Sequence, residues 1–131
     1  MAKNKMSKPP SEEDEREERI AMEIVVDAYG EEERAMGWYY YLQDRMTFPF
    51  IGICDTKRET SPLIQGERVE ALELADEEVC QHEIFVRINN SRKKQRISVP
   101  LMQLAPTDDM DSDTGEALED WRYWMNMGYK F

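Results

Sequence analysis

The apolar residues of this chain change their spacing at Phe48, and that change limits the possible folds more than any other feature of the sequence. Before Phe48, apolar side chains recur every three to four residues, as they do along one face of a helix. After it they alternate with polar side chains, as in short strands with one buried face. The sequence therefore predicts an α+β fold that begins with helices and continues with a sheet.

Two helices are predicted before the change in spacing. The first begins at Ser11, which can cap a helix with an acidic first turn, and ends at Gly30, a residue type that commonly terminates helices. The second covers residues 31–46, and Pro49 prevents it from continuing. Its apolar face is expected to consist of Ala35, Trp38, Tyr39, Leu42 and Met46. The two helices should form a helical hairpin.

Four strands are predicted next, at residues 50–54, 67–74, 82–89 and 95–104, with turn signals at Pro62, Gly66 and residues 89–91. Such short strands at hairpin spacing indicate a small curved antiparallel sheet with similarity to an SH3-like barrel. The chain then closes with a helix over residues 115–128. The apolar stripe of this helix consists of Ala117, Leu118, Trp121, Trp124 and Met125.

Length and composition indicate one domain. With 131 residues, 40% of them apolar, the chain can form a single modest core, which we place in residues 11–131. Residues 1–10 contain three lysines and a Pro-Pro step and are expected to be a disordered lead-in. The two cysteines, Cys54 and Cys80, are too few to stabilise a domain of this size through disulfide bonds, so they are expected to be buried thiols.

The charge balance narrows the classes of partner. The chain has 28 acidic and 17 basic residues and a net charge of −11, which disfavours binding to nucleic acid or to anionic membranes and favours cations. We find no apolar run long enough to cross a membrane and no secretory signal, so a cytoplasmic location is expected. A single histidine, no nucleophile motif and no glycine-rich phosphate loop argue against an enzyme.

The densest acidic segment is DDMDSDTGEALEDW, residues 108–121, which has seven carboxylates and no basic residue. Asp109, Asp111 and Asp113 alternate as the first ligands of a calcium loop do, and Asp120 stands at the twelfth position. An EF-hand is nevertheless disfavoured, because Thr114 occupies the sixth position, where glycine is required. Asp113 and Glu116 also match a capping box, so a solvated helix cap and a calcium site both remain open.

Other candidates carry weaker signals. Asp27 and Asp44 lie near the C-terminal ends of the two predicted helices, where the helix dipole disfavours a negative charge and a compensating cation would be favourable. The basic segment SRKKQR, residues 91–96, could contact RNA or an acidic partner, but the preferred interpretation is a solvated hairpin turn that discourages edge pairing. Zinc binding is disfavoured because the spacing of Cys54, Cys80 and His82 matches no closed zinc site.

Several longer strings resemble one known family. AMGWYYYLQDRMTFPF, SPLIQGERVEALELA, VPLMQL and ALEDWRYWMNMGYKF, read in this order, are similar to the cyanobacterial calcium-binding family called CcbP. The resemblance covers roughly residues 20–131, and the charged stretch of about nineteen residues before them departs from it. It implies a small acidic cytoplasmic protein that binds calcium without EF-hands, serves calcium buffering or signalling, and has no catalytic activity.

The expected metal ligands rest on the chemistry of the residues, since the resemblance supports only Asp44 and Asp120 by their place in matching strings. Calcium is expected between the acidic loop before the last helix and carboxylates at the ends of the first two helices. The predicted ligand set is Asp27, Asp44, Asp109, Asp111, Asp113, Glu116 and Asp120. The alternative is a protein-interaction module without a metal, and a protein partner is left open in either case.

Overall fold

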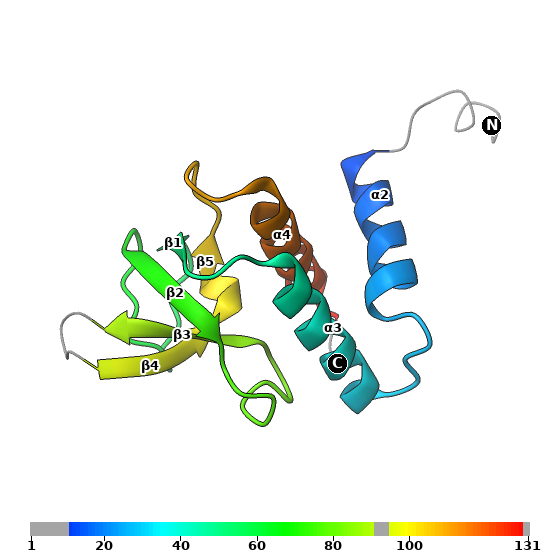
Figure 1. The fold of residues 1–131 in the computed structure, drawn as a ribbon, viewed down its shortest axis with the longest axis horizontal. Helices are drawn as coiled ribbons and strands as arrows, with labels where there is room; N and C mark the ends of the chain where they lie inside the picture. Colours follow the sequence, from blue (N-terminus) through cyan, green and yellow to red (C-terminus); the bar gives the residue numbers. More distant parts are fainter. Residues whose placement is uncertain (1–10, 91–94, 130–131) are drawn as a thin grey trace.

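The structure is a computed structural model that describes residues 11–90 and 95–129. Three helices pack side by side at one end of the molecule, and an antiparallel sheet forms the other end (Figure 1). This arrangement confirms the predicted α+β class. The expected disordered lead-in at residues 1–10 and most of the basic segment 91–96 lie outside the described residues.

The first helix, α2 (Glu12–Arg19), begins where predicted. Ser11 Oγ accepts from the Asp14 amide at 3.1 Å, and Asp14 Oδ2 accepts from the Ser11 amide at 3.3 Å, which completes a capping box. The helix continues as a π-helical turn, η1 (Ile20–Ile24), and its predicted end at Gly30 is wrong. Asp27 adopts the left-handed conformation instead, with φ 61°, and Gly30 is the extended N-cap of the next helix.

Helix α3 (Glu31–Arg45) matches the predicted bounds and most of the predicted apolar face. Ala35, Trp38, Leu42 and Met46 are buried, as expected. Tyr39 is only half-buried, and its hydroxyl donates to the Ala75 carbonyl at 2.7 Å, whereas Tyr41 is buried. The difference arises because Tyr41 faces α4, where its hydroxyl donates to Asp120 Oδ2 at 2.8 Å, whereas Tyr39 faces the loop after β2.

Gly37 permits the closest approach between α3 and η1. A Cβ atom at this position would lie 2.3 Å from the Ile24 carbonyl oxygen, so no other residue fits without backbone movement. We expect Gly37→Ala to destabilise the fold by about 1–3 kcal/mol in urea denaturation, despite the higher helix propensity of alanine.

Gly115 offers the matched control for this substitution. It lies in a helix as well, but its added Cβ would meet only Met110 Sδ, at 3.9 Å. Gly115→Ala is therefore expected to be neutral or stabilising by up to about 1 kcal/mol. Equal effects of the two substitutions would show that the contact with Ile24 is unimportant.

The sheet contains five antiparallel strands in the order β4-β3-β2-β1-β5. They are β1 (Phe50–Cys54), β2 (Arg68–Leu74), β3 (Phe85–Asn90), β4 (Gln95–Pro100) and β5 (Leu104–Ala105). The single strand predicted for residues 95–104 is wrong, because Pro100 precedes a 3-10 turn, η2 (Leu101–Gln103), that redirects the chain. The chain then pairs with β1 as β5, so the sheet is open and does not close into a barrel.

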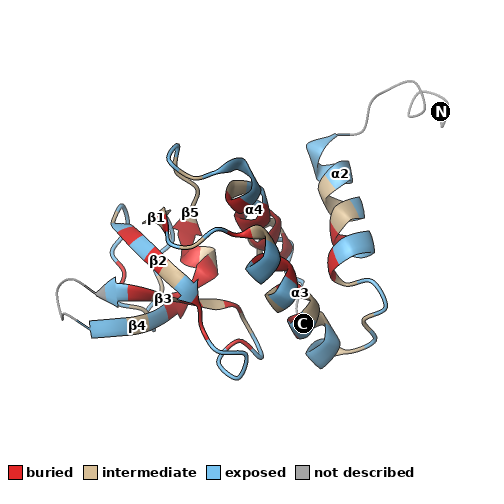
Figure 2. Ribbon diagram, viewed as in Figure 1, coloured by how far each residue is buried: buried red, intermediate tan, exposed pale blue. Residues whose placement is uncertain are grey.

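The core lies where the sheet meets α3 and the last helix, α4 (Ser112–Asn126), as the red segments in Figure 2 show. Trp38 of α3 and Trp121 of α4 are fully buried, with ring centroids 5.1 Å apart and an interplanar angle of 72°. This edge-to-face contact fixes α4 against α3. Cys54 and Cys80 are buried free thiols, as predicted.

None of the helices within residues 11–90 and 95–129 is both long enough and apolar enough to cross a membrane.

Candidate functional site

Asp120 is the most strongly bound carboxylate in the described part of the chain. It is fully buried, and its Oδ1 accepts from Arg16 Nε at 2.8 Å and from Arg19 Nη2 at 2.7 Å. Its Oδ2 accepts from Arg19 Nε at 2.9 Å and from the Tyr41 hydroxyl at 2.8 Å. The carboxylate therefore joins α2, α3 and α4 at one point, which we call the Asp120 cluster (Asp120, Arg16, Arg19 and Tyr41).

Electrostatics favour a fixed protonation pattern in this cluster. The hydrogen bond to Asp120 raises the pKa of Arg19, which stays charged. Burial, followed by the hydrogen bond to Asp120, raises the pKa of Tyr41, which stays a neutral donor. Glu116 Oε1 lies 3.8 Å from Arg19 Nε and 3.7 Å from Arg45 Nη1, so Glu116 balances part of the positive charge of these arginines. Arginine side chains neutralise Asp120 and Glu116 in the structure.

A hollow of about 260 Å³ lies beside the start of α4, and we call it the loop hollow. Glu70 of β2 faces it together with Asp109 and Asp111 from the loop before α4. Its walls are Thr47, Pro49, Phe50, Ile51 and Met110. The hollow thus brings together carboxylates from two segments that are far apart in the sequence.

Hydrogen bonds tie the segments around the loop hollow to one another. The Thr107 hydroxyl donates to the Ile51 carbonyl at 3.0 Å, and the Thr47 amide donates to Thr114 Oγ1 at 2.8 Å. Ile51 pairs with Glu70 across β1 and β2, so the bond from Thr107 to Ile51 fixes the loop before α4 close to the strand position of Glu70. The backbone around the three carboxylates is therefore well positioned.

Two of the three carboxylates in the loop hollow already have partners. Asp111 is the N-cap of α4, and its Oδ1 accepts from the Thr114 amide at 3.2 Å. The capping box considered for Asp113 and Glu116 is therefore not formed, because α4 begins before Asp113. Asp109 Oδ2 lies 3.4 Å from Arg68 Nη2, but both side chains are largely exposed, so this ion pair is weak.

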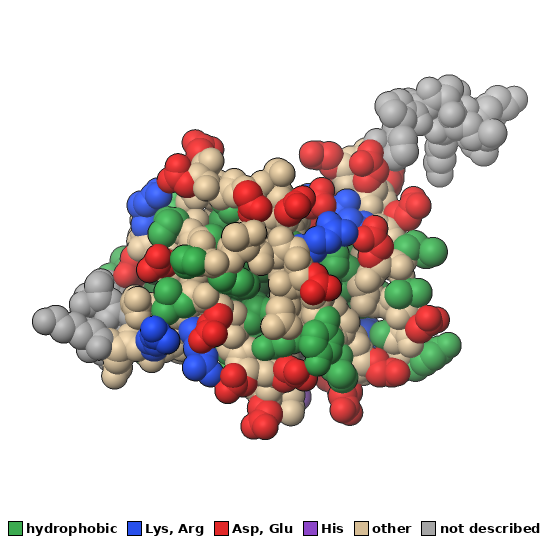
Figure 3. Space-filling model, in the orientation of Figure 1, with side chains coloured by type: hydrophobic (Ala, Val, Ile, Leu, Met, Phe, Trp, Pro, Cys, Tyr) green, Lys and Arg blue, Asp and Glu red, His purple; other side chains and the backbone are tan. Residues whose placement is uncertain are grey.

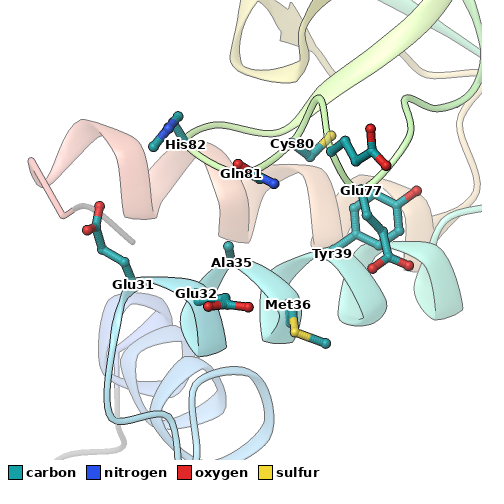
Figure 4. A pocket seen from close by; sticks show the side chains of 10 residues that line it. Glu31, Glu32, Ala35, Met36, Tyr39, Glu77, Cys80, Gln81 and His82 are labelled. Carbon is teal, nitrogen blue, oxygen red and sulfur yellow. The ribbon is translucent and has the colours of Figure 1, made fainter.

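A larger hollow, of about 440 Å³, lies between α3 and the loop that joins β2 to β3, and we call it the α3 hollow. Figure 4 shows side chains from the helix and from the loop facing each other across it. Four carboxylates line it: Glu31 and Glu32 from α3, and Glu77 and Glu78 from the loop. Acidic side chains are also spread over much of the face seen in Figure 3.

The seven predicted ligands fall into three groups. Asp109 and Asp111 line the loop hollow, whereas Glu116 and Asp120 contact arginines. Asp27, Asp44 and Asp113 are exposed and line neither hollow. Across residues 11–90 and 95–129, no three His, Cys, Asp or Glu side chains are close enough to hold a metal ion as they stand, and this includes Cys54, Cys80 and His82.

Sequence reasoning missed Glu70, Arg16 and Arg19. Glu70 alternates with the buried residues Val69 and Ala71, so its place on the outer face of a strand could be read from the period-two pattern. Arg16 and Arg19 are three residues apart in an acidic tract and therefore share a helix face. That spacing allows both arginines to bind the same carboxylate, but it does not identify the carboxylate.

Comparisons with known proteins agree on one family. A family model described as "Calcium binding", Calci_bind_CcbP, matches residues 18–125. The crystal structure of CcbP from Anabaena has 40% sequence identity and a TM-score of 0.77, and the match covers 95% of this chain and 98% of that one. A calcium binding protein in the calcium-binding form also has 40% identity, with a TM-score of 0.78 and coverage of 89% and 94%. No curated protein matches.

The family model begins at residue 18, close to the predicted start of the resemblance near residue 20. The charged stretch before it therefore lies outside the match to the family model, as expected.

Proposed function

We propose that this chain, which belongs to the CcbP family of calcium-binding proteins, binds Ca²⁺ through clustered carboxylates outside any EF-hand and so buffers or senses intracellular calcium. The observation that carries the proposal is the 40% identity, over most of both chains, to a protein solved in its calcium-binding form. We further propose that residues 11–131 act as a single domain in the cytoplasm and that the role is binding and not catalysis.

The loop hollow is the site we propose for the ion. Glu70, Asp109 and Asp111 supply hard carboxylate oxygens, which are the ligands that Ca²⁺ prefers. Calcium takes six to eight oxygens, so backbone carbonyls and water would complete its shell. Asp111 can use one oxygen as the cap of α4 and the other for the ion. The carboxylates must come closer together than they lie here, and the Glu70, Asp109 and Asp111 side chains are exposed, so rotation of the side chains can supply that movement.

The remaining predicted ligands have different parts in this proposal. Glu116 and Asp120 support the site indirectly, because they fix α4 against α2 and α3. Asp113 follows the loop in the first turn of α4, where it adds to the local negative potential. Asp27 and Asp44, both exposed, contribute only to the net charge that attracts cations.

Thermal melting tests the proposal. An ion that binds the folded state and not the unfolded one raises the melting temperature by mass action. We expect a higher melting temperature in Ca²⁺ than in chelator, and a smaller increase in Mg²⁺, which demands a tighter octahedral shell. Equal melting temperatures in all three conditions would contradict calcium binding.

A further inference from the structure

The α3 hollow has an apolar base, acidic side chains around it and exposed apolar side chains at its edge. Ala35 and Cys80 are buried at its base. Met36, which lines it, is 44% exposed, and Tyr40 and Val79 nearby are 43% and 46% exposed. Exposed large apolar side chains that gather at one depression are typical of an interaction surface.

Tyr40 and Val79 belong to the same surface as the hollow. The Tyr40 hydroxyl donates to Glu77 Oε2 at 2.9 Å, and Glu77 lines the hollow. Val79 stands between Glu78 and Cys80, both of which also line it. Tyr40 therefore borders the hollow through Glu77, and Val79 is an exposed residue of the same β2–β3 loop.

The carboxylates of this surface are not neutralised within the described parts of the chain. Glu31, Glu32, Glu77 and Glu78 form no ion pair with any lysine or arginine in residues 11–90 or 95–129, in contrast to Asp120. The positive end of the α3 dipole accounts for the two glutamates in the first helical turn. It does not account for Glu77 and Glu78, which lie in the facing loop.

We propose that the α3 hollow is a docking site for a basic amphipathic segment of a partner protein. Lysine or arginine side chains of that segment would face the four glutamates, and its apolar side chains would cover Met36, Tyr40 and Val79. Charge complementarity selects this occupant, because a cationic segment relieves the repulsion among the carboxylates and, unlike a metal ion, its apolar side chains also cover the exposed ones. The volume of about 440 Å³ suits a few anchoring side chains.

This site is separate from the proposed calcium site, because the α3 hollow and the loop hollow share no lining residue. Binding to it therefore needs no calcium. The test is made in chelator, so that failure of one proposal does not imply failure of the other.

The probe is a fluorescently labelled synthetic helix with lysines on one face and leucines on the other, titrated at physiological ionic strength and followed by anisotropy. We expect the probe to bind the unmodified chain. The double variant Glu32→Gln with Glu78→Gln, and separately Met36→Ser, should each weaken binding about tenfold. All three side chains are exposed, and none makes a hydrogen bond within the described residues, so the fold should be unaffected.

The matched controls remove the same charge and the same kind of apolar group elsewhere. Glu18→Gln with Glu59→Gln changes two exposed glutamates outside the hollow, and Met127→Ser changes a methionine that is 53% exposed. These variants should change affinity by less than about twofold. Equal weakening by the two charge pairs would overturn the proposal in favour of bulk attraction. No binding of the probe, or no effect of Met36→Ser, would overturn it as well.

Discussion

Replacing Asp120 by asparagine is expected to destabilise the fold by about 3–5 kcal/mol, the range found when one partner of a buried ion pair is removed. Asparagine has nearly the same shape, so the effect reports the lost charge together with the loss of one acceptor, because its NH2 group would face donors of the cluster. The side chains of Arg16 and Arg19 are only 18% exposed, and without the carboxylate they would repel each other in a partly dry environment.

Urea denaturation of the variant and of a neighbouring control measures this effect. Glu119 is adjacent on α4 and lies 3.7 Å from Arg16 Nη2, but its side chain is 52% exposed. Glu119→Gln should therefore cost less than about 0.5 kcal/mol, as exposed ion pairs usually do. If the two variants lose equal stability, the Asp120 cluster does not hold α2 in place.

Local signals in the sequence were sufficient to predict most helices and strands, but not where one element ends and the next begins. Ser11 caps α2 as predicted because a capping box depends only on residues three positions apart. Gly30 failed as a helix stop because the preceding π-turn ends the helix earlier and Asp27 takes the left-handed position. Likewise, Pro100 divides a continuous apolar pattern, and the resulting short strand β5 is defined only by its pairing with β1.

The positions of the carboxylates could be predicted only where their partners are close in the sequence. Asp120 and Arg16 are separated by 104 residues, so no periodicity could reveal that an arginine would neutralise this aspartate. Its position in the spacing of a calcium loop therefore suggested a ligand, whereas the structure gives it internal partners. Asp109 and Asp111 could be placed at one hollow because they are near neighbours in the chain, but Glu70 joins them only through the β1–β2 pairing.

Among substitutions at the loop hollow, Asp111→Asn is expected to separate metal binding from folding. Asparagine caps helices about as well as aspartate, so the Thr114 amide keeps its acceptor and α4 begins at the same residue. The melting temperature in chelator should therefore stay within about 1–2 °C of the unmodified chain, as a change of a few tenths of a kcal/mol implies. The negative charge and one carboxylate oxygen are lost, which costs the helix little and removes a ligand of the ion.

Calorimetric titration should then show calcium affinity reduced at least about tenfold in Asp111→Asn, and similarly in Glu70→Gln and Asp109→Asn, because each removes one of the three charges that face the ion. Asp44→Asn and Asp27→Asn remove the same charge from exposed positions outside the loop hollow, and screening should limit their effect to less than about threefold. Reduced affinity in all five variants to the same degree would mean that net charge and not the loop hollow governs calcium binding. Unchanged affinity in the three loop-hollow variants would move the site elsewhere on the molecule without contradicting the family assignment.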